Sequence, residues 1–335
     1  PIQMNYKHTD GVSYTFNLID TPGHVDFTYE VSRSMAACEG ALLIIDASQG
    51  VEAQTVSNAY MAIDSNLDII PVINKIDMPN ADIESATKQT VELLGCDESE
   101  VISISAKSSI NIEQVFDAII NRISPPKDPG IDKTRALIFD SNFDQFRGVI
   151  PYVRVMDGYI EKGMTCQYFA SSSVHEITEV GILKMKKMPV KRLNPGDVGY
   201  IVASIKKVSE IEVGDTLTVK ENKATEPLPG YKPIKPTVFS GMYPIDSNDY
   251  ENLRVSLNKL KLNDSSFSFE PESSSALGLG FRCGFLGLLH LEIITQRLER
   301  EFDINLITTT PGVVYKLIKI NNEIEDLQNP TTMPD

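Results

Sequence analysis

Four short apolar segments in the first 124 residues constrain the fold more than any other feature of this sequence. They are YTFNLID (14–20), ALLIID (41–46), DIIPVIN (68–74) and VISIS (101–105), and helical stretches lie between and after them. The two middle segments are almost continuously apolar, as strands buried on both faces of a sheet are. Strand–helix alternation of this kind predicts a doubly wound α/β sheet. Ligands of such a sheet bind at the carboxyl ends of its strands.

The clearest helix is predicted over residues 111–123. Asn111 stands immediately before its apolar residues, where its side chain is expected to cap the helix. The apolar residues recur at helical spacing and fall on one face: Ile112, Val115, Phe116, Ile119, Ile120 and Ile123.

The remainder of the chain changes character at two Pro-rich segments. SPPKDPG (124–130) is predicted to be a linker, and residues 133–222 then show short β-rich segments with the turn signals MDG, EKG, NPGD and VGD, typical of an all-β barrel. After PLPGYKPIKP (227–236), the order strand, helix, strand, strand, helix, strand predicts a ferredoxin-like α+β domain over residues 235–320. Its first helix is marked by apolar residues at 250, 253, 257 and 260, and its second is expected from Phe285 to about Phe302.

Composition excludes several classes of protein. With 41% hydrophobic residues in 335, the chain can bury two or three cores, but no apolar run approaches the roughly 20 residues that span a bilayer. The four cysteines are widely spaced and form no metal-binding pattern, which indicates free thiols rather than disulfides or a zinc site. The chain begins at Pro1 without a methionine, so we interpret it as an internal piece of a longer protein.

The net charge of −15 argues against a nucleic-acid partner, but the charge is unevenly distributed. Residues 1–124 carry 6 Lys or Arg against 18 Asp or Glu, whereas residues 133–222 carry 13 against 11. The second region includes the run KMKKMPVKR at 184–192. This run is consistent either with local docking on RNA or with an ordinary solvated strand edge.

Three short motifs each follow a predicted strand: DTPG at 20–23, NKID at 74–77 and SAK at 105–107. Each motif alone is common by chance, and Asp, Asn and Ser also favour ordinary caps and turns. Their order, their position at strand ends and their spacing of 54 and 31 residues together are far more specific. The combination predicts a guanine nucleotide site.

Each residue type suits part of that ligand. The carboxylate of Asp77 can accept two hydrogen bonds from the N1–H and the exocyclic amine of guanine, a pair that adenine does not offer. Asn74 can tie neighbouring loops to the base, the aliphatic stem of Lys75 can lie on the ring, and the backbone N–H of Ala106 can donate to guanine O6. Asp20 is expected to hold Mg²⁺ through water.

The turn after the first motif is expected to contact the γ-phosphate. The backbone N–H of Gly23 can bond this phosphate because no side chain obstructs it. A GTPase also needs a water molecule held in line with the γ-phosphate, and His24 directly follows Gly23. The predicted GTP-binding residues are Asp20, Thr21, Pro22, Gly23, His24, Asn74, Lys75, Asp77, Ser105, Ala106 and Lys107.

DTPGH, the following VDF, NKID and SAK together resemble the G domain of the translational GTPases. The resemblance implies that His24 is catalytic and orients the attacking water; the alternative is that His24 only caps the helix that follows. His8, His175 and His290 have no comparable neighbours and are expected to be structural or exposed.

Two further segments extend the resemblance over the whole chain. Residues 143–164 resemble the second-domain barrel of the elongation factors, which rests on ribosomal RNA. Residues 270–293, EPESSSALGLGFRCGFLGLLHLEI, resemble the signature of the elongation factor 4 (LepA) family. The glycines within that segment are spaced GxGxxxG and not GxGxxG, so they predict a turn or bulge and not a dinucleotide site.

The family also implies parts that this sequence lacks, since no GxxxxGK[ST] phosphate loop and no switch threonine occur. We therefore expect the full-length protein to be the GTPase and these 335 residues alone to be inactive. The resemblance implies GTP or GDP with Mg²⁺, and ribosome and tRNA as partners without DNA. It implies a role in moving tRNAs backwards or in translation fidelity. The expected location is the cytoplasm, with peripheral membrane contact allowed, or an organellar matrix.

Two alternatives remain beside this interpretation. One is another translational GTPase of the elongation factor G type, against which residues 270–293 argue. The other is a non-catalytic module that binds ribosomal RNA through the barrel. A phosphate loop encoded upstream of Pro1 would distinguish the enzyme from the module.

Overall fold

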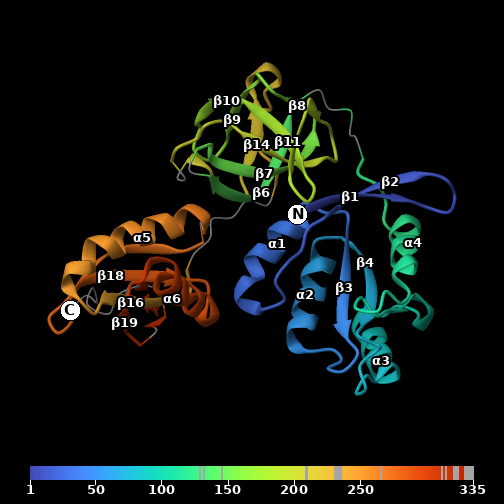
Figure 1. Cartoon of the computed structure of the whole chain (residues 1–335), viewed down its shortest axis with the longest axis horizontal. Coiled ribbons are helices and arrows are strands. Elements are labelled where there is room, and N and C mark those ends of the chain that lie inside the picture. The colour runs from blue at the N-terminus through green and yellow to red at the C-terminus, as the bar shows by residue number, and fades with distance from the viewer. Residues whose placement is uncertain are drawn as a thin grey trace. The chain divides into compact units, whose positions relative to one another are not determined.

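The computed structural model describes residues 1–127, 130, 133–144, 146–207, 210–229, 236–264, 266–310, 312–313, 315–319 and 324–327. The chain divides into two compact units, Pro1–Tyr231 and Lys232–Asp335. Figure 1 labels the helices and strands of both units. Within the described residues, no helix has the length and apolar character needed to cross a membrane.

A parallel sheet with helices on both faces forms the start of the first unit. Its strand order is β3-β4-β5, with β3 at Gly40–Asp46, β4 at Asp68–Asn74 and β5 at Ile102–Ser103. The helices are α1 (Thr28–Ala36), α2 (Ala53–Asp64), α3 (Ile83–Leu94) and α4 (Ile112–Arg122). The predicted doubly wound α/β architecture is confirmed, although the strand expected at 101–105 is only two residues long.

Alternate residues of β4 explain why its sequence is apolar throughout. Ile70 and Val72 pack in one cluster with Val115 of α4. Ile73, which points to the opposite face, packs with Ala86 of α3. Because helices cover both faces, neither set of side chains can be polar.

The segment expected at 14–20 is a strand, β2 (Ser13–Leu18), but its partner is one that the sequence did not reveal. It pairs antiparallel with β1 (Ile2–Lys7) in a separate two-stranded sheet (Figure 1). The hairpin is fixed by Tyr6, whose ring stacks on Phe116 of α4 with 4.6 Å between centroids.

Strand β3 lies at an edge of the parallel sheet, and Ile44 on it is 51% exposed.

Asn111 occupies the N-cap position of α4, as predicted, but its side chain does not cap the helix. Its backbone is left-handed, with φ of 58°, and its Nδ2 donates to the carbonyl oxygen of Ser103 at 2.8 Å. The predicted capping bond is therefore wrong. The side chain instead links the start of α4 to the end of β5.

The predicted barrel region folds as an antiparallel sheet of eight strands in the order β10-β9-β15-β6-β7-β14-β11-β12. Strands β8 (Ile160–Glu161) and β13 (Arg192–Leu193) pair separately. The glycines of all four predicted turns have positive φ, which confirms those turns: Gly158, Gly163, Gly196 and Gly214. The eight strands are β6 Arg135–Asp144, β7 Gly148–Asp157, β9 Thr165–Tyr168, β10 Val174–Glu176, β11 Glu179–Leu183, β12 Lys187–Val190, β14 Val198–Val202 and β15 Thr216–Val219.

A buried arginine joins this β-sheet to the parallel-sheet part of the same unit. Arg154 on β7 is 7% exposed, forms an ion pair with Glu39 and donates from Nη1 to the carbonyl oxygen of Ala37 at 2.7 Å. Both partners follow α1 directly. The helix after the DTPGH turn is therefore tied at its carboxyl end to the barrel strands.

The second unit has the predicted order of strands and helices. It runs β16 (Val238–Pro244), α5 (Tyr250–Asn263), β17 (Ser268–Ser274), β18 (Gly278–Phe285), α6 (Leu288–Phe302) and β19 (Leu306–Thr308), and the sheet order is β17-β18-β16-β19. This is the ferredoxin-like arrangement. Helix α6 begins at Leu288, so the expectation that it starts at Phe285 is wrong, since Phe285 ends β18 and lies in the core.

Short strands complete the second unit. Strand β20 (Gly312–Val313) pairs with β16, and β21 (Tyr315–Ile318) pairs with β22 (Ile324–Leu327). Most of the second predicted connector, residues 230–235, lies outside the described residues.

The glycines of the GxGxxxG segment have structural roles in β18, in agreement with the predicted turn. Gly278 leaves the β17–β18 turn with φ of +80° and open space around it. At Gly280 a Cβ would overlap the ring of Tyr243 and lie 2.6 Å from the carbonyl oxygen of Met242. The absence of a side chain at 280 lets β18 approach β16 closely.

Gly280→Ala should therefore lower the free energy of unfolding by roughly 1–3 kcal/mol, because neither the Met242 backbone nor the buried Tyr243 ring can move away easily. Gly278→Ala is the matched control and should cost about 1 kcal/mol, from left-handed backbone alone. Urea unfolding of both variants measures the difference. Equal costs would show that the close approach at Gly280 is unimportant.

Candidate nucleotide site

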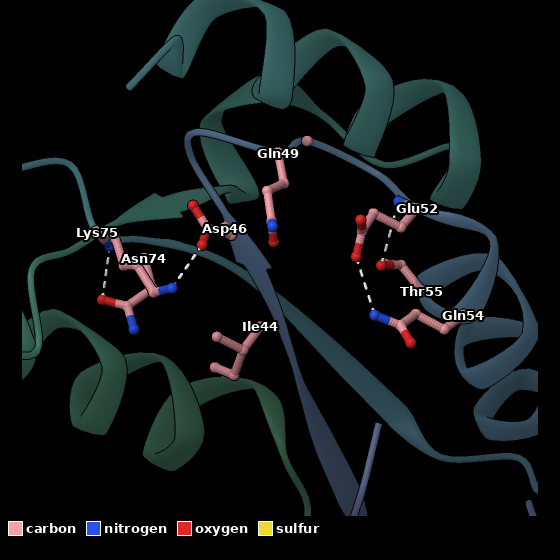
Figure 2. A pocket seen from close by; sticks show the side chains of 9 residues that line it. Ile44, Asp46, Gln49, Glu52, Gln54, Thr55, Asn74 and Lys75 are labelled. Atoms are coloured by element: carbon pink, nitrogen blue, oxygen red, sulfur yellow. Dashed lines mark hydrogen bonds and ion pairs between the residues drawn. The ribbon is translucent and has the colours of Figure 1, made fainter. Parts of the chain in front are cut away.

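The NKID and SAK motifs lie at the carboxyl ends of the parallel strands β4 and β5, where a doubly wound sheet binds its ligands. The DTPG motif was expected at the end of a strand of the same sheet, but it follows β2, which pairs only with β1. Asp46 at the end of β3 and Asn74 at the end of β4 are level in the parallel register. A pocket of about 260 Å³ opens between these ends. Its lining residues, most of which Figure 2 labels, are Ile44, Asp46, Gln49, Gly50, Glu52, Gln54, Thr55, Asn74 and Lys75.

Asn74 connects two of the predicted motifs. Its Oδ1 accepts the backbone N–H of Lys75 at 2.7 Å and the backbone N–H of Ala106 at 3.0 Å. Lys75 adopts a left-handed backbone, with φ of 66°, immediately after the strand. Asn74 thus links the two loops, and its predicted contact with the base stays a prediction. The N–H of Ala106, which is predicted to donate to guanine O6, donates to Oδ1 of Asn74 in this structure.

Asp77 and Ser105 form the second link between the same two loops. The hydroxyl of Ser105 donates to Oδ1 of Asp77 at 2.6 Å, and its oxygen accepts the N–H of Ser108 at 3.1 Å. Ser105 is fully buried. The hydrogen bond from Ser105 lowers the pKa of Asp77, so this carboxyl is ionised at neutral pH, as a reader of guanine must be. Ser105 therefore closes its own turn through Ser108 and also holds Asp77, the residue predicted to bind the guanine base.

Lys107 lies on the same loop with an exposed side chain, and its charge contributes to the lowered pKa of Asp77. The structure thus brings together the residues predicted to surround the base. They are Asn74, Lys75, Asp77, Ser105, Ala106 and Lys107.

The DTPGH turn follows β2 and is largely exposed. Asp20, Thr21 and Gly23 are exposed, and Pro22 is half-buried. The carbonyl oxygen of Gly23 accepts a hydrogen bond from Nδ2 of Asn58 at 3.3 Å, which links this turn to α2. A Cβ at Gly23 would meet nothing within 4 Å. Open space at this backbone leaves room for the predicted approach of a phosphate.

His24 makes the helix-cap contact that was the alternative to a catalytic role. It is the N-cap of a short 3₁₀ helix, Val25–Phe27, and its Nδ1 accepts the N–H of Asp26 at 3.2 Å. Because Nδ1 is an acceptor here, the proton of the neutral ring is on Nε2. The ring is 47% exposed, so capping does not bury it away from a ligand.

The other three histidines have local partners, as expected for structural residues. His8 contacts Asp10 and Asp117, and His175 contacts Glu210 at 2.8 Å. His290 is 2% exposed on α6. Its Nδ1 accepts the N–H of Leu286, so Nε2 carries the proton and donates to Asp264 at 2.9 Å.

The contact between His290 and Asp264 predicts a pH effect on the second unit. Burial alone would raise the pKa of Asp264, but the hydrogen bonds from His290 and Ser266 outweigh burial and lower it. A carboxyl with a lowered folded-state pKa contributes stability above its unfolded-state pKa of about 3.9 and loses that contribution as pH falls. Asp264→Asn should therefore flatten the loss of stability between about pH 5 and pH 2.

Urea unfolding at a series of pH values tests this expectation. Glu299→Gln, which removes an exposed carboxyl from α6, serves as the control and should keep the acid sensitivity of the wild type. Parallel curves for wild type and Asp264→Asn would contradict the assignment.

Of the nine residues that line the pocket, only Asn74 and Lys75 were predicted from the sequence, and Asp46 is among those that were missed. Its Oδ2 lies 2.6 Å from Nζ of Lys75, and this ion pair lowers the pKa of Asp46 to about 2. The available signal was the same one that identified Asn74: a polar residue that ends an apolar strand candidate, ALLIID.

No group of three or more metal-ligating side chains occurs among the residues that the structure describes. All four cysteines are free, at positions 38, 96, 166 and 283. Burial raises the pKa of Cys38 and of Cys166 to about 11, so these thiols are protonated at neutral pH.

Comparison with known proteins gives the class of protein first. The elongation factor Tu GTP binding domain matches residues 2–125, and elongation factor Tu domain 2 matches residues 148–218. The two matches, in this order, indicate the class of elongation factor Tu-like proteins.

Full-chain relatives narrow the class. Elongation factor 4 of Pelodictyon phaeoclathratiforme is 54% identical over 334 residues, and elongation factor 4 of Chlorobium chlorochromatii is also 54% identical over 334 residues. Each match covers 100% of this chain and 55% of the relative, so the chain spans about 55% of the length of these curated relatives. The chain belongs to the elongation factor 4 family of translational GTPases.

A solved structure supports the fold. The crystal structure of ttk003000868 from Thermus thermophilus superposes with a TM-score of 0.67 at 16% sequence identity. The superposition covers 97% of this chain and 63% of that one.

The resemblance predicted from residues 270–293 is confirmed by the curated relatives.

Proposed function

We propose that the full-length protein is a ribosome-dependent GTPase that acts in translation, with the guanine base read by Asp77. The observation that carries the proposal is the cluster of Asn74, Asp77, Ser105 and Ala106 at the ends of β4 and β5. Two hydrogen bonds across 28 and 32 residues of sequence fix the ionised carboxylate beside a backbone amide. The carboxylate complements guanine, since it supplies acceptors for N1–H and the amine. The Ala106 N–H, which donates to Oδ1 of Asn74 at 3.0 Å, would serve O6 only by giving up or dividing that bond.

The family also implies Mg²⁺, and the described residues offer one carboxylate, that of Asp20, to help hold it. Asp20 offers an exposed carboxylate oxygen, the ligand type that Mg²⁺ prefers. With no acidic cluster in the described residues, most ligands of the ion would be phosphate oxygens and water, and Asp20 would act through water. When bound, the ion supplies charge neutralisation to the phosphates.

His24 is the residue that we assign to the attacking water. Its position directly after Gly23 and its exposed ring support this role. The neutral ring carries its proton on Nε2 because Nδ1 accepts the N–H of Asp26. The remaining polar atom of the ring is thus available for a water molecule near the phosphate that the Gly23 N–H would bond.

The barrel supports contact with ribosomal RNA. The predicted basic run extends from the β11–β12 turn, where Met185 is 91% exposed and Lys186 is exposed, through β12 to the exposed Lys191 and to Arg192 of β13, which pairs with Glu161. Exposed cationic side chains suit a phosphate backbone. Ribosome and tRNA are the partners in the proposal, the cytoplasm is its location, and backward movement of tRNA or translation fidelity is its role. None of the described residues supports the peripheral membrane contact that the resemblance allows.

Initial rates of GTP hydrolysis by the full-length protein test the proposal. We expect hydrolysis to be slow alone and strongly stimulated by ribosomes, and ATP to be a poor substrate. Binding to ribosomes without any stimulated hydrolysis would instead favour the non-catalytic RNA-binding module.

A further inference from the structure

The ion pair between Lys75 and Asp46 has an unusual setting for an exposed lysine. Nζ of Lys75 lies 2.6 Å from Oδ2 of Asp46, although the Lys75 side chain is 55% exposed. Figure 2 shows the lysine reaching from the end of β4 to the end of β3. Exposed ion pairs contribute little to stability because ordering two side chains offsets their attraction. The pair therefore calls for a role other than stability.

The carboxylate of Asp46 is also held by Ser48, independently of Lys75. Its Oδ1 accepts both the backbone N–H of Ser48 at 2.8 Å and the Ser48 hydroxyl at 2.7 Å. Its side chain is 16% exposed, and Oδ2 faces Lys75. One oxygen thus belongs to the turn after β3, and the other gives Lys75 a fixed anchor.

An anchored ammonium fixes the rest of the lysine side chain. The four-carbon stem of Lys75 runs between its left-handed backbone and Asp46, along the pocket that Asn74 also lines. An apolar stem held in this way can cover a planar ring, whereas a free lysine would lose its rotamer freedom when a ligand binds.

We propose that Asp46 is a positioning residue for the guanine nucleotide, which holds Lys75 so that its stem forms one wall of the base pocket. This inference rests on the proposed function, because it takes the ligand to be a guanine nucleotide. Asp46 does not contact the base and does not select guanine. It acts through Lys75, and its effect appears in affinity.

Titration of the full-length protein with a fluorescent GDP analogue tests the inference through a double-mutant cycle. Asp46→Asn keeps an acceptor for Ser48 and removes the charge that holds Lys75. Lys75→Met keeps an unbranched apolar stem and removes the ammonium. Each variant should weaken GDP binding about tenfold, the scale expected for ordering one long side chain. The double variant should bind no more weakly than either single variant.

Asp68→Asn is the charge-matched control, since Asp68 begins β4 at the end opposite to Asn74 and is exposed. It should bind GDP as the wild type does. In ribosome-stimulated turnover, Asp46→Asn should raise KM for GTP about tenfold and leave kcat unchanged, because base contacts are equal in the ground and transition states. If Asp46 only stabilised the fold, Asp46→Asn would not raise KM while leaving kcat unchanged.

Additive losses in the double variant would overturn the inference, since they would assign the effect of Asp46 to the Ser48 turn. Tighter GDP binding by Asp46→Asn would also overturn it, because Asp46 would then restrain Lys75 from the nucleotide. If Asp46→Asn fails to fold, Lys75→Met alone decides: unchanged GDP affinity overturns the inference. The proposed function is tested separately: if Asp77→Asn binds GDP like the wild type, the guanine site itself is wrong.

Discussion

Asp77→Asn in the full-length protein should lose its preference for guanine and gain affinity for xanthine nucleotides. The amide that replaces the carboxylate presents a donor to the exocyclic amine of guanine, which is itself a donor. Xanthine has a carbonyl at that position, so the same amide can donate to it while its oxygen accepts N1–H. GDP affinity should fall on the order of 10²-fold, as expected when a hydrogen-bonded charged group loses its match.

The loop should survive this change, because the Ser105 hydroxyl can donate to the amide oxygen as it does to Oδ1 of Asp77. Titration with fluorescent GDP and XDP analogues measures the exchange of preference, and Asp68→Asn again serves as the charge-matched control. A variant that binds GDP like the wild type would remove Asp77 from the site.

His24→Ala should separate binding from hydrolysis. If His24 orients water and does not hold the nucleotide, the variant should bind GTP nearly as the wild type does. Its ribosome-stimulated turnover should fall by about 10²-fold or more, the range of other positioned catalytic groups. Single-turnover hydrolysis on ribosomes, with GTP affinity measured in parallel, gives both quantities.

The helix-cap contact of His24 provides the competing outcome. Removing the ring also removes the acceptor for the Asp26 N–H, which should cost about 1 kcal/mol of stability by itself. His175→Ala, a histidine on β10 that contacts Glu210, is the matched control and should hydrolyse GTP normally. Normal turnover with reduced stability in His24→Ala would leave His24 as a cap alone.

The sequence by itself determined the features that depend on neighbouring residues. Burial on two faces requires an unbroken apolar strand, so β4 was readable from DIIPVIN. ALLIID likewise predicted β3, although β3 lies at the sheet edge with Ile44 51% exposed. The turn glycines of the barrel were readable because positive φ is a local requirement, met most easily by glycine. The motifs at 74–77 and 105–107 were readable because a strand end is itself a local position.

Partners far apart in the chain were decided only by the tertiary structure. Residue spacing does not indicate that the N–H of Ala106 bonds Asn74 32 residues earlier, or that Lys75 reaches back 29 residues to Asp46. Likewise, the pattern of 14–20 predicted a strand but not its pairing with β1, and Asn111 was placed at a helix start without its bond to Ser103. A side chain at a helix or strand end has several donors and acceptors within reach, all of similar local energy. Packing of the helices on the sheet fixes which of them lies within about 3 Å, and that choice depends on the whole domain.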